Sequence, residues 1–80
     1  MNTTPEQLDC RNLLCPLPVI RTQQQIETMA NGATLTVTCT DPGVLQDIPT
    51  WCRIHGHEVT GIIEEGREIR ITIVVGSPTS

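Results

Sequence analysis

The sequence contains almost no aromatic side chains: one tryptophan, no tyrosine and no phenylalanine among 80 residues. It also lacks a basic run, because nine acidic residues outnumber five basic ones and give a formal net charge of −4. Modules that bind RNA combine stacking aromatics with a basic surface, so we expect no direct contact with nucleic acid. An acidic surface suits a protein partner that carries lysine or arginine.

Long apolar runs are missing as well. No run approaches the roughly 20 residues that span a bilayer, and the first residues, MNTTPEQ, lack the basic and apolar segments of a secretory signal. We therefore expect no membrane span and a cytoplasmic location, where cysteines stay reduced. The four cysteines, at positions 10, 15, 39 and 52, form no Cys-x-x-Cys pair and lack the short paired spacings of a zinc site. No metal and no other cofactor is predicted.

A chain this short forms one domain, and we expect residues 1–80 to be a single domain with an ordered core from about 7 to 75. Apolar side chains recur at helical spacing in two segments. Four other segments have the alternation or the β-rich composition of strands. Right-handed crossovers put both helices on one side of the sheet. The prediction is an α/β two-layer sandwich of order β-α-β-α-β-β, with a mixed four-stranded sheet and two helices on one face. The expected strands are 7–10, 34–40, 58–64 and 67–75, and the expected helices are 16–30 and 44–55.

Glycine and proline set the expected helix boundaries. The pair Asn31-Gly32 is a standard helix stop, so we expect the first helix to end at Ala30. Pro49 falls inside the second helical segment, and a helix interior resists proline by about 3 kcal/mol. We therefore expect a loose first turn there, with a firm helix that begins near Asp47 as its cap and has Pro49 in its opening turn.

Cys15 is the strongest candidate for a reactive residue. It stands at the start of the first predicted helix, in the motif Cys15-Pro16-Leu17-Pro18. Helix N-termini carry unpaired N–H groups and a partial positive charge of roughly +0.5, and cysteines there have pKa values lowered from about 8.5. We therefore expect Cys15 to be a nucleophile at neutral pH that can hold a persulfide, with Pro16 and Pro18 stiffening the turn. The alternative is that Cys15 is simply a small residue at a helix start.

The remaining candidates each have a structural alternative. Cys10 could act as a resolving thiol for Cys15, or it could fill the end of its strand. Asp41 and Arg21 could bind a protein partner, although turn formation and solvation are also reasonable roles for them. The two other cysteines are expected to be buried core residues. No histidine is evidently placed as a base for the nucleophile, so we expect a carrier rather than a self-sufficient enzyme. The chain is also expected to be a monomer.

One family shares these motifs. Residues 8–20, LDCRNLLCPLPVI, resemble the signature of the TusA/SirA/YeeD-like sulfur carriers. Residues 40–42 (TDP), 47–52 (DIPTWC) and 56–58 (GHE) resemble the second half of the same family. The similarity covers about residues 7–75, and the Cys-Pro-x-Pro element is its most specific part. The resemblance implies the same β-α-β-α-β-β fold and a persulfide on the matching cysteine, Cys15.

The sequence departs from the family pattern at Asn12, where the family usually has glycine. Asparagine tolerates a positive φ better than most residues, so we expect the turn to be kept. The resemblance further implies a sulfur-donor protein, either a cysteine desulfurase or a rhodanese, and a sulfur-acceptor protein. Three pathways remain open: tRNA thiolation, cofactor biosynthesis and sulfur oxidation. The competing hypothesis is a redox-sensing or regulatory interaction module on the same fold, in which Cys10 and Cys15 form a disulfide.

Overall fold

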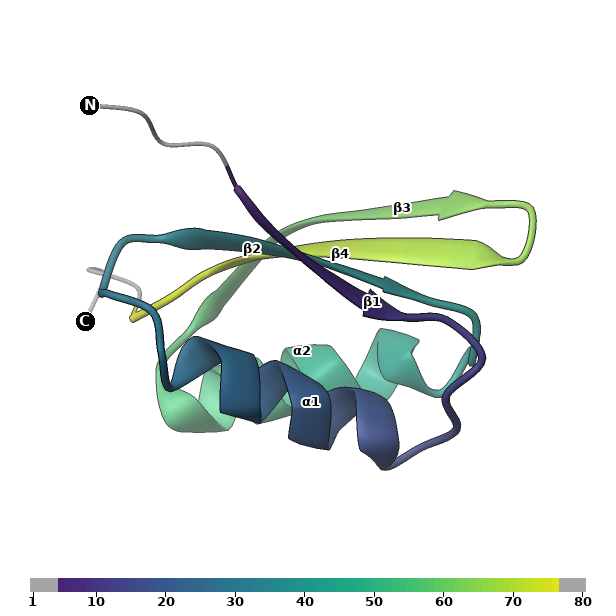
Figure 1. The fold of residues 1–80 in the computed structure, drawn as a ribbon, viewed down its shortest axis with the longest axis horizontal. Coiled ribbons are helices and arrows are strands. Elements are labelled where there is room, and N and C mark those ends of the chain that lie inside the picture. Colours follow the sequence, from purple (N-terminus) through teal and green to yellow (C-terminus); the bar gives the residue numbers. More distant parts are fainter. Residues whose placement is uncertain (1–4, 77–80) are drawn as a thin grey trace.

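A computed structural model describes residues 5–76, which form six elements in the predicted order (Figure 1). The predicted strands agree with the observed ones to within one residue at each end. Residues 1–4 and 77–80, which precede and follow the expected core of residues 7–75, lie outside the described residues. The elements are β1 (Glu6–Cys10), α1 (Leu17–Ile26), β2 (Thr34–Cys39), α2 (Val44–His55), β3 (Glu58–Glu65) and β4 (Glu68–Val74).

The four strands form one mixed sheet in the order β1-β2-β4-β3. β1 and β2 run parallel, whereas β4 is antiparallel to both β2 and β3. Both helices cover the same face of this sheet (Figure 1). The predicted two-layer sandwich is therefore confirmed, together with its element order and its mixed sheet. Within residues 5–76, no helix is long and apolar enough to cross a membrane.

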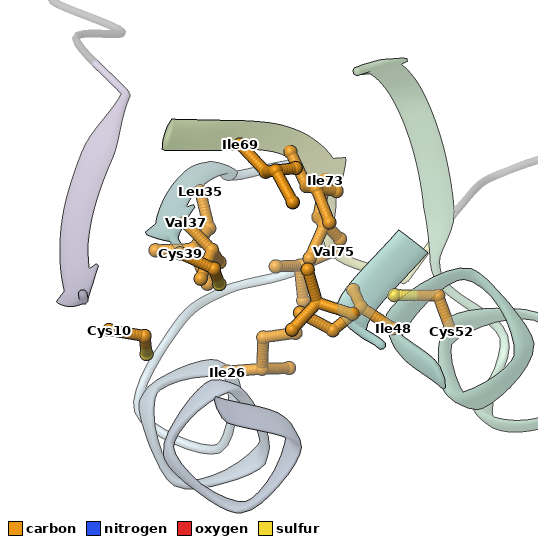
Figure 2. Close-up of a cluster of buried hydrophobic side chains, with 12 residues drawn as sticks. Cys10, Ile26, Leu35, Val37, Cys39, Ile48, Cys52, Ile69, Ile73 and Val75 are labelled. Atoms are coloured by element: carbon orange, nitrogen blue, oxygen red, sulfur yellow. The ribbon is translucent and has the colours of Figure 1, made fainter. Parts of the chain in front are cut away.

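The core lies between the sheet and the helices and contains mostly aliphatic side chains (Figure 2). Leu35, Val37 and Cys39 alternate with threonines along β2 and are fully buried. The antiparallel register places them opposite the isoleucines of β4. Burying an aliphatic side chain completely contributes about 1.5–3 kcal/mol, so this double row binds the sheet to the helices. The threonines of β2 lie on the opposite face.

The first helix is shorter than predicted. α1 ends at Ile26, and tighter turns follow, in which Thr28 N donates to Gln25 O (3.0 Å) and Met29 N donates to Ile26 O (2.9 Å). The Thr28 hydroxyl also donates to Gln25 O (2.7 Å), and such local bonds compete with regular helix bonds. The expected end at Ala30 is therefore wrong.

The second helix begins earlier than predicted. α2 is helical from Val44, with Gly43 as its N-cap and Pro49 inside it. The cause lies in the preceding turn, where Asp41 Oδ1 accepts from Gly43 N (3.2 Å) and Asp41 O accepts from Val44 N (3.1 Å). This side-chain turn starts the helix one turn before Asp47. The expected cap at Asp47 is wrong.

Candidate functional site

The loops that follow β1 and β2 meet at one edge of the sheet, because these two strands are parallel. Two hydrogen bonds join the loops: Asn12 N donates to Thr40 Oγ1 (2.9 Å), and Cys15 N donates to Asp41 Oδ2 (3.0 Å). Asn12 has a φ of 66°, which confirms that asparagine takes the left-handed conformation in this turn. The joined loops hold Cys15 beside the start of α2.

Gly43 leaves room for the sulfur of Cys15. A Cβ added to Gly43 would lie 3.1 Å from Cys15 Sγ and 3.6 Å from Asp41 Oδ2, and the first of these distances is shorter than an ordinary van der Waals contact. The peptide bond from Cys15 to Pro16 is cis. Cys15 is partly exposed, whereas the three other cysteines are buried. The accessible thiol of the chain therefore lies against the N-terminal end of α2.

The electrostatic surroundings of this thiol oppose its ionisation. Partial burial, together with the negative charges of Asp41 and Asp47 nearby, raises the pKa of Cys15 to about 12. Hydrogen bonds from Cys15 and from Gly43 N–H lower the pKa of Asp41, so this carboxylate is ionised at neutral pH. The prediction that the pKa of Cys15 is lowered is wrong.

The start of α1 supplies too few amide donors to reverse this effect. Pro16 is the N-cap of α1 and Pro18 lies in its first turn, and proline has no N–H group. Leu17 N already donates to Leu14 O (2.9 Å). The motif therefore removes the N–H groups that an ordinary helix start would offer to a thiolate. Pro18 is fully buried, so it also anchors α1 in the core.

Cys10 lies opposite Cys39 in the parallel register of β1 and β2, and both side chains are fully buried. Burial raises the pKa of both thiols, that of Cys39 to about 12. Arg21 is exposed on α1, and its positive charge lowers the pKa of Cys10, whereas burial raises it. The structure thus brings Asp41 to Cys15, and it pairs Cys10 with Cys39.

A groove of about 350 Å³ opens between α1 and α2, next to Cys15. The groove is lined by Pro16, Val19, Gln46, Asp47, Thr50, Trp51 and Ile54. Four large apolar side chains are exposed on the two helices and on the loop before α1, and we call them the apolar rim. The apolar rim consists of Leu14, Leu17, Ile20 and Ile54.

The two histidines pack against Trp51. The ring centroids of His55 and His57 lie 4.8 Å and 5.3 Å from that of Trp51. His57 Nδ1 accepts a hydrogen bond from Gly76 N (2.8 Å), and burial together with the charge of His55 lowers the pKa of His57. These contacts support a structural role for both histidines.

Gly43 and Asp47 are parts of the site that sequence reasoning missed. Asp47 was expected to cap a helix, but Gly43 has that position and Asp47 lies one turn later. Side chains one turn apart share a helix face, so a correct helix start would have placed Asp47 near Cys15. Among the described residues, no group of three or more His, Cys, Asp or Glu side chains could hold a metal ion.

Comparison with known proteins points to one family. The family model described as "Sulfurtransferase TusA" matches residues 6–75. The sulfur carrier protein TusA of Allochromatium vinosum is 34% identical over 68 residues, which cover 85% of this chain and 90% of that protein. The putative sulfur carrier protein YrkF of Bacillus subtilis is 33% identical over 63 residues, which cover 79% of this chain. The match spans about a third of YrkF, namely 34% of its length.

A solved structure has the same fold. The crystal structure of a SirA-like protein from Desulfitobacterium hafniense aligns with a TM-score of 0.77 and covers 89% of this chain and 97% of that chain. The two sequences are 22% identical, so this likeness supports the two-layer architecture alone.

Proposed function

Since the chain belongs to the TusA family of sulfurtransferases, we propose that it is a sulfur carrier that holds sulfane sulfur as a persulfide on Cys15. One observation carries the proposal: Cys15 is partly exposed at the joined loops, whereas the three other cysteines are buried. Thiol exchange needs an accessible sulfur. The carrier role therefore falls on this residue.

The proposed reaction has two half-reactions of thiol–persulfide exchange. In loading, the Cys15 thiolate attacks the terminal sulfur of a donor persulfide, the donor S–S bond breaks, and the donor cysteine leaves as a thiolate. In delivery, an acceptor thiolate attacks the terminal sulfur on Cys15, and Cys15 leaves with the bonding electrons and takes up a proton. Neither step changes the total number of sulfur–sulfur bonds, so no external oxidant or reductant is needed.

The proposed partners are a donor, either a cysteine desulfurase or a rhodanese, and an acceptor in tRNA thiolation, cofactor biosynthesis or sulfur oxidation. We place their docking surface at the apolar rim and at Asp41, with Arg21 on the neighbouring face of α1. Four free thiols agree with a cytoplasmic location. The edge strand β3 carries Glu64 and Glu65, and edge charges disfavour pairing between copies, so we propose a monomer.

The test is persulfide loading followed by mass spectrometry. Incubation with a cysteine desulfurase and cysteine should add about 32 Da, one sulfur atom, to a single site. Cys15→Ser should abolish this addition, because it removes the accessible sulfur. Cys10→Ala should load like the wild type, because Cys10 is buried opposite Cys39.

Two outcomes would contradict the proposal. Loading that survives Cys15→Ser would show that another residue accepts the sulfur. An intact wild-type protein that never loads, but forms a Cys10–Cys15 disulfide with peroxide, would favour the redox-sensing alternative. Thiol counting before and after peroxide treatment separates these cases.

A further inference from the structure

The charges around Cys15 all have the same sign. Asp41 accepts from Cys15 N (3.0 Å) and from Gly43 N (3.2 Å), and these bonds fix its carboxylate beside the sulfur. Asp47 lies in the first turn of α2 and lines the groove together with Pro16. Gly43 allows this turn to approach Sγ closely. Acidic side chains from two segments therefore flank the partly exposed thiol.

No described cation offsets these carboxylates at the sulfur. Within residues 5–76, the charged groups that act on the Cys15 thiol are Asp41 and Asp47. The buried thiol of Cys39, at the end of β2, is the remaining titratable neighbour. Arg21 of α1 acts on Cys10 instead. The surrounding negative charges therefore oppose the formation of a thiolate at Cys15.

We propose that Asp41 and Asp47 make sulfur exchange at Cys15 selective for cationic partners, and that Asp47 is a specificity-determining residue of the site. An arginine or lysine of a docked protein pairs with the carboxylates, and the opposite charge then favours the thiolate. In the free carrier the thiol stays protonated, so exchange is slow. The inference rests on the proposed function for the choice of Cys15 as the exchanging residue.

The same charges retain sulfur after loading. Delivery expels Cys15 as a thiolate, and a thiol with a high pKa is a slow leaving group. Small free thiols therefore remove the sulfur slowly as long as no cation is bound to the carboxylates. A docked cation speeds delivery for the same reason that it speeds loading. One pair of side chains thus controls both half-reactions.

The test compares three small disulfides that differ in charge: cationic cystamine, neutral 2-hydroxyethyl disulfide and anionic dithiodiglycolate. In each reaction the Cys15 thiolate attacks one sulfur of the disulfide and expels the other half of the reagent as a thiolate. The three remaining cysteines are buried, so Cys15 is the residue expected to react. Rates are divided by those of the neutral thiol N-acetylcysteine amide, which cancels leaving-group differences. We expect Cys15 to prefer cystamine to dithiodiglycolate by about tenfold at low salt, and added salt should shrink this preference.

Asp47→Asn is the informative variant, because it removes one charge and keeps the size of the side chain. Loss of a nearby negative charge lowers the pKa of Cys15. A tenfold gain in thiolate should speed alkylation by iodoacetamide at pH 7.5 about threefold, because a more acidic thiolate is a weaker nucleophile. The preference for cystamine should fall several-fold, because one of the two negative charges near the sulfur is removed. Glu27→Gln, at the C-cap of α1, is the matched control and should keep the wild-type preference.

An Asp47→Asn protein with the wild-type preference and the wild-type pH–rate profile of alkylation would overturn the inference. The salt dependence of the wild-type protein checks it independently of any variant, and a preference that is insensitive to salt would also overturn it. These results are separate from persulfide loading. Failure to load with the charge preference intact would instead reject the proposed function.

Discussion

Gly43 determines how closely the second helix can approach the sulfur of Cys15. Its φ of −59° and ψ of −23° are ordinary helical values, so the backbone itself does not require glycine. Space is the requirement, since an added Cβ would lie 3.1 Å from Cys15 Sγ. Any larger residue must displace either the sulfur or the first turn of α2.

Gly43→Ala should slow persulfide loading of Cys15 without unfolding the protein. The added methyl group pushes Sγ away by a few tenths of an ångström, and small misplacements of reacting atoms reduce rates strongly, here by about threefold to tenfold. The measurement is kcat/KM for loading by a cysteine desulfurase, with thermal unfolding followed in parallel.

Gly61→Ala is the control for this prediction, because nothing lies within 4 Å of a Cβ added there. It should load at the wild-type rate. If Gly43→Ala also loads at that rate, then close packing of α2 on the sulfur does not matter for exchange.

Single residues differ in how far the sequence reveals their roles. The exposed position of Cys15 before α1 and the turn at Asn12 follow from local rules: a specific motif and the tolerance of asparagine for positive φ. The role of Asp47 depends on where α2 starts, which the sequence misplaced. Thr22 is fully buried on α1 with no hydrogen-bond partner for its hydroxyl among the described residues, and a polar residue gives no apolar signal that predicts burial.

The two helices tolerate proline for different reasons. Pro18 lies in the first turn of α1, where a missing N–H group leaves no intrahelical bond unmade, and it is fully buried. Pro49 lies inside α2, where its missing N–H group removes one helix bond and its ring crowds the preceding turn. Proline is therefore compatible with the first turn of α1, whereas it costs α2 one backbone hydrogen bond.

Replacing each proline by alanine should change stability in opposite directions. Pro49→Ala restores a helix bond and should raise the free energy of unfolding by about 1–2 kcal/mol. Pro18→Ala removes two buried methylene groups and should lower it by about 1–2 kcal/mol. Urea unfolding monitored by circular dichroism measures both. A destabilised Pro49→Ala protein would show that Pro49 is fitted to its place in the helix.

Strands were predicted better than helix ends for a physical reason. Polar and apolar residues alternate along β2 because one face is buried, so the bounds of the strand can be predicted from its side-chain types. The end of α1 depends on the hydroxyl of Thr28, and the start of α2 depends on the carboxylate of Asp41. These side chains can make several local bonds, and tertiary packing decides which one forms. The same Asp41 bonds also built the part of the site that the sequence did not predict.

The two sides of the molecule have different characters. The open face of the sheet carries the threonines of β2, whereas the helical side carries the apolar rim and the flanking carboxylates of Asp41 and Asp47. Ile54 is 71% exposed on α2, close to the groove, and Ile63 is 58% exposed on β3. Ile63 pairs with Arg70 in the sheet register, so it belongs to the open face. The docking surface proposed for the partner therefore includes Ile54 and not Ile63.

Ile54→Ala should therefore weaken loading by a desulfurase, whereas Ile63→Ala should not. Loss of one apolar contact at the centre of an interface raises KM by about tenfold. Both substitutions truncate an exposed isoleucine without adding charge, so the pair is matched. Loading kinetics at several carrier concentrations give KM for each variant.

Chemical loading with inorganic polysulfide distinguishes docking from reactivity. Polysulfide makes no protein interface, so Ile54→Ala should load from it at the wild-type rate if its defect lies in docking. A variant that is slow with both sulfur sources would have a disturbed thiol instead. Equal KM values for the two isoleucine variants would show that the partner approaches Cys15 without using the groove between the helices. The surface that recognises the partner would then have to be sought on the loop side of the site, around Asp41.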